Sequence, residues 1–474
     1  MNFPLVGFII AYHPLASKRP LRANREPRKA YDLRHCSNHR KESMQRSPLL
    51  VFATLLLTSC ITSRSSAPDG DRNLPPDPER MRAAVALAED PRVSRAFEHV
   101  EANREEILTE WIALTEINAP SGHEEERARY VEEALRCCRV EVRRDAAGNV
   151  IATRRGTGDG PVVVLDAHLD TVFQPGLQIT ATVKDGRIFA PGVGDATRNI
   201  EAILATLRAL DAADISTKGD LIALFSVEEE TNFRGINQFL DDNGEKVDHV
   251  LVFDGGYAGF TYGGLGIHWY RHHFIGPGGH TLSRTPPFSA TLPAARAIAR
   301  IAELEMPRDV SGRLNVGMMG GAEVVNAKAQ DAWFTVDLRS TDNSILAEYE
   351  AIIAGIVDQE ARKAGMTSRT ENISKTPAAQ IPGHRTSHLI RTAEAVHIAA
   401  GFENPPIMNS ASNNASVAFQ RGISALSTGT APCSDAHALT ESCPIEPFYK
   451  GIRKMILLAL ALAEIDPAPS MENR

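Results

Sequence analysis

The chain has 474 residues, of which 43% are hydrophobic, with 34 glycines and 28 prolines. A chain of this length and composition can bury a large core, and we expect roughly two or three domains. The formal net charge of −8 and the aromatic content of 6% argue against a nucleic-acid partner, which would favour a basic surface and aromatic side chains for base stacking.

The first 60 residues form an N-terminal extension whose composition differs from the rest. Residues 1–43 are rich in Lys and Arg. From Met44 a short polar stretch leads into an apolar run, Leu49–Leu57, which is too short to span a bilayer. The ending Leu-Thr-Ser-Cys60 resembles a bacterial lipoprotein signal peptide. We therefore expect a start at Met44, a lipid anchor at Cys60 as the only membrane attachment, and a periplasm-facing lipoprotein of the cell envelope; a buried or cytoplasmic helix is the alternative.

Further along the chain, local patterns predict helices and strands. Residues 61–80 are rich in Ser, Pro and Asp and are expected to form a flexible linker. Residues 81–117 have apolar side chains at helical spacing. Ser121 followed by Glu124 is a capping-box signature, so a second helix is expected to begin there. Residues 139–153 alternate like a strand at the edge of a sheet.

Three apolar segments are typical of buried parallel strands. They comprise residues 161–170, 221–227 and 250–254. The polar side chains that end them are His168 and Asp170 in the first, Glu228, Glu229 and Glu230 after the second, and Asp254 in the third. Ligands of such sheets collect at the carboxyl ends of the strands, so we expect these side chains to lie together. Asp195, which follows a Gly-rich turn and precedes a predicted helix over 200–212, is expected to join them.

Each of these signals has a simpler explanation when it is taken alone. His168 could be a satisfied histidine at a strand end, Asp195 a helix N-cap, and the three glutamates a solvated loop. Repetition at the same end of successive strands favours a different explanation. Imidazole and carboxylate are typical ligands of zinc, so the pattern indicates a metal site with a general base.

The motifs and their order resemble the co-catalytic zinc metallopeptidase family of peptidase T, acetylornithine deacetylase, aminoacylase and glutamate carboxypeptidase. The resemblance covers about residues 100–465 and is carried by His168-Leu-Asp170-Thr, Gly194-Asp195, the glutamates before Phe-Arg-Gly235, and Asp254. It implies an α/β fold with a mainly parallel central sheet flanked by helices, interrupted by a smaller α+β lid. We expect the catalytic domain in residues 81–263 and 376–474, and the lid, which often dimerises in this family, in residues 264–375.

The resemblance implies two Zn²⁺ ions per chain, for which Co²⁺ or Mn²⁺ could substitute. The expected metal ligands are His168, Asp195, Glu230, Asp254 and His437. Asp195 would bridge both ions, and His168 and Asp254 would complete one of them. Glu230 and His437, which lies in the segment Ser434-Asp-Ala-His437, would complete the other.

Two carboxylates, Glu229 and Asp170, are expected to be catalytic. Gly235 lies six residues after Glu229, which is the spacing between the base and the following glycine in relatives. Glu229 would therefore take a proton from a metal-activated water. Asp170 would either fix the tautomer of His168 or act as a further ligand.

The resemblance also implies three substrate-binding side chains in the lid, which are His280, Asn326 and Arg339. His280 would stabilise the oxyanion, reaching across a homodimer if one forms, and Arg339 would pair with a substrate carboxylate. The chain departs from the family at Asn414, where many relatives have Asp, and this leaves the substrate detail open.

We expect a di-zinc metallohydrolase that cleaves amide bonds of small peptides, as an exopeptidase of tripeptidase or carboxypeptidase type. The alternative is an N-acyl amino acid deacylase with the same centre, and a more distant one is a non-catalytic binding protein on the same fold. The expected partners are a small peptide or N-acyl amino acid substrate and a second copy of the chain. Cys433 and Cys443 could pair in an oxidising periplasm.

Overall fold

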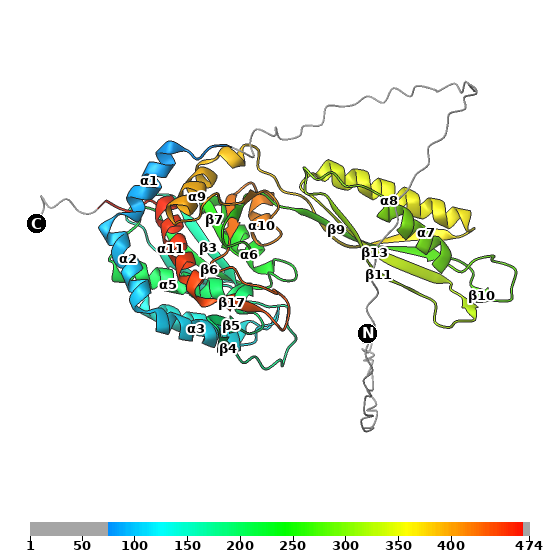
Figure 1. Ribbon diagram of the computed structural model, residues 1–474, viewed down its shortest axis with the longest axis horizontal. Coiled ribbons are helices and arrows are strands. Elements are labelled where there is room, and N and C mark those ends of the chain that lie inside the picture. Colours follow the sequence, from blue (N-terminus) through cyan, green and yellow to red (C-terminus); the bar gives the residue numbers. More distant parts are fainter. Residues whose placement is uncertain (1–73, 468–474) are drawn as a thin grey trace, which may run out of the picture. The chain divides into compact units, whose positions relative to one another are not determined.

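The computed structural model describes residues 74–467 (Figure 1). The expected signal peptide and the lipid anchor at Cys60 lie outside the described residues, as do residues 61–73 of the expected linker. Helix α1 (Pro78–Ala88) begins inside that linker, because the Asp77 side chain accepts hydrogen bonds from the N–H groups of Glu79 and Arg80 and caps the helix. The helix therefore includes the last three residues of the expected linker.

The central sheet has eight strands in the order β1-β2-β6-β3-β7-β16-β8-β15. The strands are β1 (Glu141–Arg144), β2 (Val150–Arg154), β6 (Leu221–Ser226), β3 (Val163–His168), β7 (His249–Phe253), β16 (Ser424–Thr428), β8 (Phe260–Thr261) and β15 (Ile407–Met408). The four in the middle, β6, β3, β7 and β16, are parallel. Their carboxyl ends therefore lie along one edge of the sheet, and this edge carries the predicted site.

Alternate residues of the middle strands enter two different apolar layers. Val163 and Leu165 of β3 pack in the larger layer and Val164 in the smaller one. The helices of the larger layer are α1, α2 (Pro91–Ala102), α3 (Arg104–Glu116), α4 (Glu125–Ala134), α5 (Arg198–Ala212), α9 (His388–Ala399) and α11 (Ile445–Leu462). The smaller layer is covered by α6 (Arg234–Asn243) and α10 (Ala415–Gln420) (Figure 1). Burying one such Val or Leu contributes about 1.5–3 kcal/mol, so the sheet is anchored on both faces.

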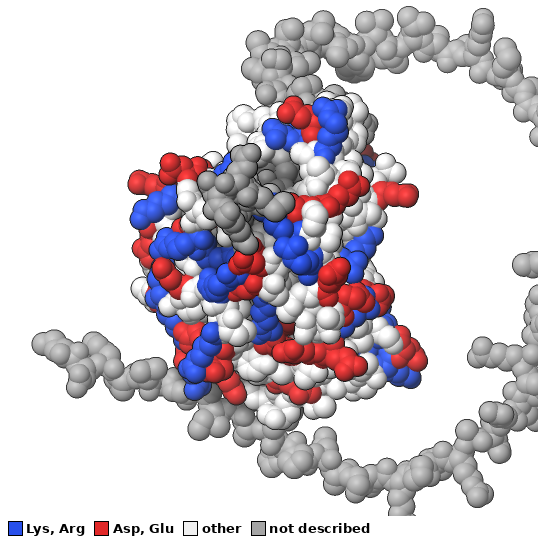
Figure 2. All heavy atoms as spheres, turned by 90° about the vertical axis from the view of Figure 1, so that its left-hand side faces the viewer, with Lys and Arg blue, Asp and Glu red and all other residues white. Residues whose placement is uncertain are grey.

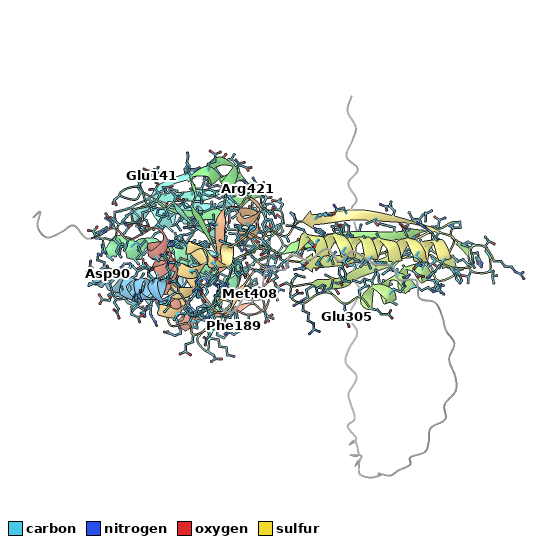
Figure 3. The ribbon with its side chains drawn as sticks, turned by 90° about the horizontal axis from the view of Figure 1, so that it is seen from above. Asp90, Glu141, Phe189, Glu305, Met408 and Arg421 are labelled. Atoms are coloured by element: carbon cyan, nitrogen blue, oxygen red, sulfur yellow. A yellow bond between two sulfur atoms is a disulfide. The ribbon has the colours of Figure 1, made fainter. Side chains whose placement is uncertain are left out.

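The lid has its own sheet and its own apolar core. Its four antiparallel strands, in the order β11-β13-β9-β14, are β9 (Gly266–Ile275), β11 (Arg313–Gly321), β13 (Asp331–Ser340) and β14 (Thr367–Thr376). Helices α7 (Thr291–Ala302) and α8 (Asn343–Lys363) pack on this sheet, and Figure 3 shows α8 lying along it. A two-stranded ribbon of β10 (Gly279–His280) and β12 (Ala327–Lys328) completes the lid.

A small three-stranded sheet holds the segment that follows His437. Its strands are β17 (Ser442–Pro444), β5 (Arg187–Phe189) and β4 (Thr182–Lys184). Cys443 on β17 pairs with Ile188 on β5, so a segment near the end of the chain is fixed beside the turn that carries Asp195.

The expected capping box at Ser121 and Glu124 is wrong. The Ser121 hydroxyl donates a hydrogen bond to Asp170 Oδ2 at 2.6 Å instead of capping a helix. Glu124 accepts a hydrogen bond from the N–H of Gly122 at 2.9 Å, and α4 begins at Glu125 without a side-chain cap. Asp170, 49 residues further along the chain, binds the hydroxyl that the sequence pattern assigned to the start of the helix.

The surface viewed in Figure 2 carries acidic and basic side chains in mixture. On this face the described residues form no extended region of a single charge sign. Among residues 74–467, no helix is long and apolar enough to cross a bilayer.

Candidate metal centre

The predicted side chains meet where the parallel strands end. His168 is the last residue of β3, Glu229 and Glu230 follow β6, and Asp254 follows β7. The Nε2 atom of His168 lies 2.9 Å from Oδ1 of Asp195. Ligand atoms of His168, Asp195 and Glu230 lie within 4.8 Å of one another. The topology has thus joined three segments that are far apart in the sequence.

His437 approaches the same group from the last part of the chain. Its Nε2 atom lies 3.2 Å from Oδ2 of Asp195 and 3.1 Å from Oε1 of Glu230. Each oxygen of Asp195 therefore faces an imidazole nitrogen. Oε1 of Glu230 is buried, and among residues 74–467 no group donates a hydrogen bond to it. Two imidazoles, a carboxylate between them and a buried carboxylate oxygen without a hydrogen bond are a donor set that fits zinc.

The pKa values of this cluster differ strongly from their ordinary values. Burial lowers the pKa of His168, but its hydrogen bonds with Asp170 and Asp195 outweigh burial and hold that pKa well above its usual range. Burial opposes ionisation of Asp195, yet the two imidazoles keep its pKa below the usual value. Asp195 raises the pKa of His437 to about 9, and burial raises that of Glu230 to about 7. Without a cation, protons on the imidazoles neutralise part of the acidic charge.

Asp170 positions its neighbours. Its Oδ1 accepts the N–H of Glu229 at 3.0 Å, and its Oδ2 accepts the N–H of Glu230 at 3.1 Å. Oδ1 also lies 3.4 Å from Nδ1 of His168, on the side of the ring away from Asp195. Of the two roles expected for Asp170, this arrangement favours orientation of His168.

Glu229 is buried beside the cluster, with 8% of its surface exposed. Burial, together with the charges of Asp254, Glu230 and Asp195, raises its pKa well above the usual value despite the nearby His168. Within residues 74–467 its carboxylate makes no hydrogen bond, while Glu228 is bound by Arg234. A buried carboxylate with a raised pKa beside a metal site is suited to moving a proton near neutral pH.

Two contributors were not predicted from the sequence. The Asn413 amide donates to Oδ2 of Asp254 at 2.9 Å and so orients an expected metal ligand. Both oxygens of Glu441 accept hydrogen bonds from the turn before α5, at 2.7–2.8 Å from the nitrogens of Gly192, Gly194 and Asp195. Asn413 is the neighbour of Asn414, where the chain departs from the family, and Glu441 lies four residues after the expected ligand His437. These two positions were the signals that could have pointed to them.

The three predicted lid residues do not contact this cluster within the described part of the chain. His280 is exposed on β10, where Nδ1 accepts the N–H of Leu282. Asn326 is exposed before β12, and its carbonyl accepts the N–H of Thr281. Arg339 on β13 pairs with Asp337 at 3.0 Å. Their expected substrate-binding roles stay predictions.

Comparison with known proteins decides the family. Residues 164–461 match the family model described as Peptidase family M20/M25/M40. The chain belongs to this family. The expected family and fold class are thereby confirmed, since the M20 match spans the segments that end in His168, Glu230 and His437.

Two curated relatives are distantly similar to parts of this chain. Carboxypeptidase G2 of Pseudomonas sp. (strain RS-16) is 27% identical over 137 residues, which is 28% of this chain and 33% of that protein. A putative LysW-lysine/LysW-ornithine hydrolase of Pyrobaculum aerophilum is 33% identical over 136 residues, 29% of this chain and 37% of that protein. The matches thus span about a third of the length of these curated relatives.

Solved structures share the fold over a longer range. A tripeptidase from Staphylococcus aureus superposes with a TM-score of 0.68 at 20% identity, covering 76% of this chain and 99% of that one. A dinuclear metal-binding peptidase of the M20 family from Bacillus subtilis gives 0.60 at 14% identity, covering 77% and 100%. At these identities the likeness shows the fold alone.

Proposed function

We propose that this M20 protein is a di-metal hydrolase that cleaves amide bonds of small peptides, with Zn²⁺ as its metal. The observation that carries the proposal is the position of Asp195 between His168 and His437, at 2.9 and 3.2 Å. A carboxylate that faces two imidazoles can bridge two cations. Membership of a peptidase family agrees with this chemistry.

The chain supplies ligands for two ions. His168 and Asp254 would hold one, and Glu230 and His437 the other, with Asp195 shared. Two such ions, when bound, polarise the scissile carbonyl and lower the pKa of water towards about 7.

The remaining steps belong to side chains near the ligands. Glu229 takes a proton from the attacking water and delivers it to the leaving amine. Asp170 holds the backbone of Glu229 and Glu230 through two hydrogen bonds, so the base and the ligand keep their separate positions. In the lid, His280 and Asn326 would contact the substrate carbonyl, and Arg339 a substrate carboxylate; His280 could come from a second copy in a dimer.

The substrate class is tested with a panel assayed on protein that begins after Cys60. We expect cleavage of dipeptides or tripeptides, loss of activity with a chelator, and recovery when Zn²⁺ is added back. Cleavage of N-acyl amino acids but not of peptides would replace the peptidase by a deacylase. Hydrolysis that survives complete metal removal would contradict the proposal.

A further inference from the structure

The segment that carries His437 is a closed loop. Residues 434–442 leave and re-enter the fold through a pair of backbone hydrogen bonds, from Ser434 N to Ser442 O at 2.9 Å and from Ser442 N to Ser434 O at 3.1 Å. Directly outside this pair, Cys433 and Cys443 form a disulfide. The disulfide therefore closes the base of the loop covalently.

The backbone inside the loop is constrained. Asp435 and His437 have φ values of 61° and 67°, in the left-handed region that non-glycine residues rarely adopt. Such conformations persist only where the surrounding structure holds them. The ring of His437 is half exposed. Hydrogen bonds inside the loop, from Ala438 N to Asp435 O at 3.0 Å and from Glu441 N to Ala438 O at 3.1 Å, and the closed base of the loop hold the backbone instead.

The disulfide also adjoins the turn that carries Asp195. A Cβ atom on Gly194 would lie 2.7 Å from Cβ of Cys433 and 2.7 Å from Oε1 of Glu441, so the cystine packs directly on this turn. Glu441, inside the same loop, accepts the N–H groups of Gly194 and Asp195. One closed segment therefore fixes both His437 and the turn of the shared ligand.

We propose that the Cys433–Cys443 disulfide is a positioning clamp for the metal ion held by Glu230 and His437. The clamp keeps the loop closed, so that His437 stays directed at Asp195 and Glu230 before the ion binds. The ion held by His168 and Asp254 takes these two ligands from strand ends, and its third ligand, Asp195, keeps the backbone hydrogen bond to Glu441 without the disulfide, so it depends less on the clamp. This inference rests on the proposed function, because it assumes two metal ions.

The test compares metal binding by calorimetric titration of three metal-free proteins. They are the wild type, the double variant Cys433→Ser/Cys443→Ser, and the control Cys137→Ser/Cys138→Ser, which removes the two free cysteines among residues 74–467. We expect the disulfide variant to keep one ion at close to wild-type affinity and to bind the second about 10- to 100-fold more weakly, the usual effect of losing a partner that orients a ligand. The control should bind both ions as the wild type does.

Two further measurements separate positioning from general damage. In the disulfide variant, excess Zn²⁺ should restore the hydrolysis rate, which an unfolded protein could not regain. The metal-free variant should also be cut faster by a protease near Leu439, which is 68% exposed in the loop. Cys443 is buried beside β5, whose Phe189 is labelled in Figure 3, so replacing it could unfold the protein. If the double variant does not fold, the single variant Cys433→Ser, which leaves Cys443 in place, is measured by the same criteria.

If the folded disulfide variant binds both ions with wild-type affinity, the proposed clamp is wrong. It is also wrong if the variant binds both ions more weakly by the same factor. A wild type that binds fewer than two ions would instead show that the proposed function fails, and the inference with it.

Discussion

Asp195 is the residue that links the two halves of the proposed centre. Its carboxylate lies between two imidazoles, and its backbone N–H is held by Glu441. Asn413 plays a similar orienting part for Asp254. The ligands are thus held in place by hydrogen bonds from residues that do not themselves contact the proposed ions.

Protons and metal ions compete for His437 and Glu230. In the metal-free protein the pKa of His437 is raised to about 9 and that of Glu230 to about 7. A metal ion must displace those protons, so Zn²⁺ should bind more tightly as the pH rises from about 6 to about 9, with protons released. Titration calorimetry in buffers of different ionisation enthalpy measures both effects.

The same protonation has a consequence for stability. The folded-state pKa of His437 lies above its ordinary value because of its ion pair with Asp195. This pair therefore stabilises the metal-free protein fully below about pH 6.5, and the stabilisation is lost as the pH rises through about 9. The variant His437→Ala should lack this part of the pH dependence of the free energy of unfolding.

For the metal-binding prediction, a Zn²⁺ affinity that does not change with pH would contradict the assignment of His437 as a ligand.

Four of the expected ligands, His168, Asp195, Glu230 and Asp254, could be proposed from the sequence because each one ends or follows a strand or follows a glycine turn, whereas His437 was implied by the resemblance to the family. Asn413 and Glu441 could not be assigned in this way. Asn413 is 159 residues from Asp254, and Glu441 is 246 residues from Asp195. Local patterns do not specify which distant backbone or side chain a buried amide or carboxylate will meet.

At the scale of single elements, β3 is the strand on which the site is built. All six of its residues are buried, and Leu165 lies in the larger apolar layer. Leu165→Ala should lower the free energy of unfolding by about 2–5 kcal/mol through lost burial and a cavity. Leu282→Ala is the matched control, since Leu282 is 87% exposed and should change it by less than about 0.5 kcal/mol. Equal urea midpoints for the two variants would contradict this packing.

Apolar strands were the elements best predicted from the sequence. The segments over 161–170 and 221–227 contain β3 and β6, and the segment over 250–254 covers β7 except for its first residue, His249. A branched apolar run has few alternatives to a buried strand. The capping box failed because Asp170 competes for the hydroxyl of Ser121. A signal of two residues is easily overridden by a tertiary hydrogen bond.

At the scale of the whole molecule, the change of pattern near Gly264 coincides with the start of β9 at Gly266. The sequence could not indicate how the lid residues would meet a substrate, because His280 and Asn326 are exposed on or beside the ribbon of β10 and β12. Their substrate-binding roles stay predictions.

We also propose that the chain is a lipoprotein of the cell envelope, anchored at Cys60. In a bacterial host the full chain should then fractionate with membranes, and Cys60→Ala should move it to the soluble fraction, because the acyl chains are the only anchor proposed. Cys36→Ala should leave the distribution unchanged. If all three proteins fractionate alike, the anchor proposal is wrong.

The most direct test of the proposed centre is to measure metal content and peptide hydrolysis together for Glu229→Gln, with Glu228→Gln as the matched control, because Glu228 pairs with Arg234. We expect Glu229→Gln to keep two metal ions per chain and to lose about 10²- to 10⁴-fold in rate, while Glu228→Gln keeps both metal and rate. A Glu229→Gln protein that loses its metal, or that keeps the wild-type rate, would contradict the assignment of Glu229 as the general base.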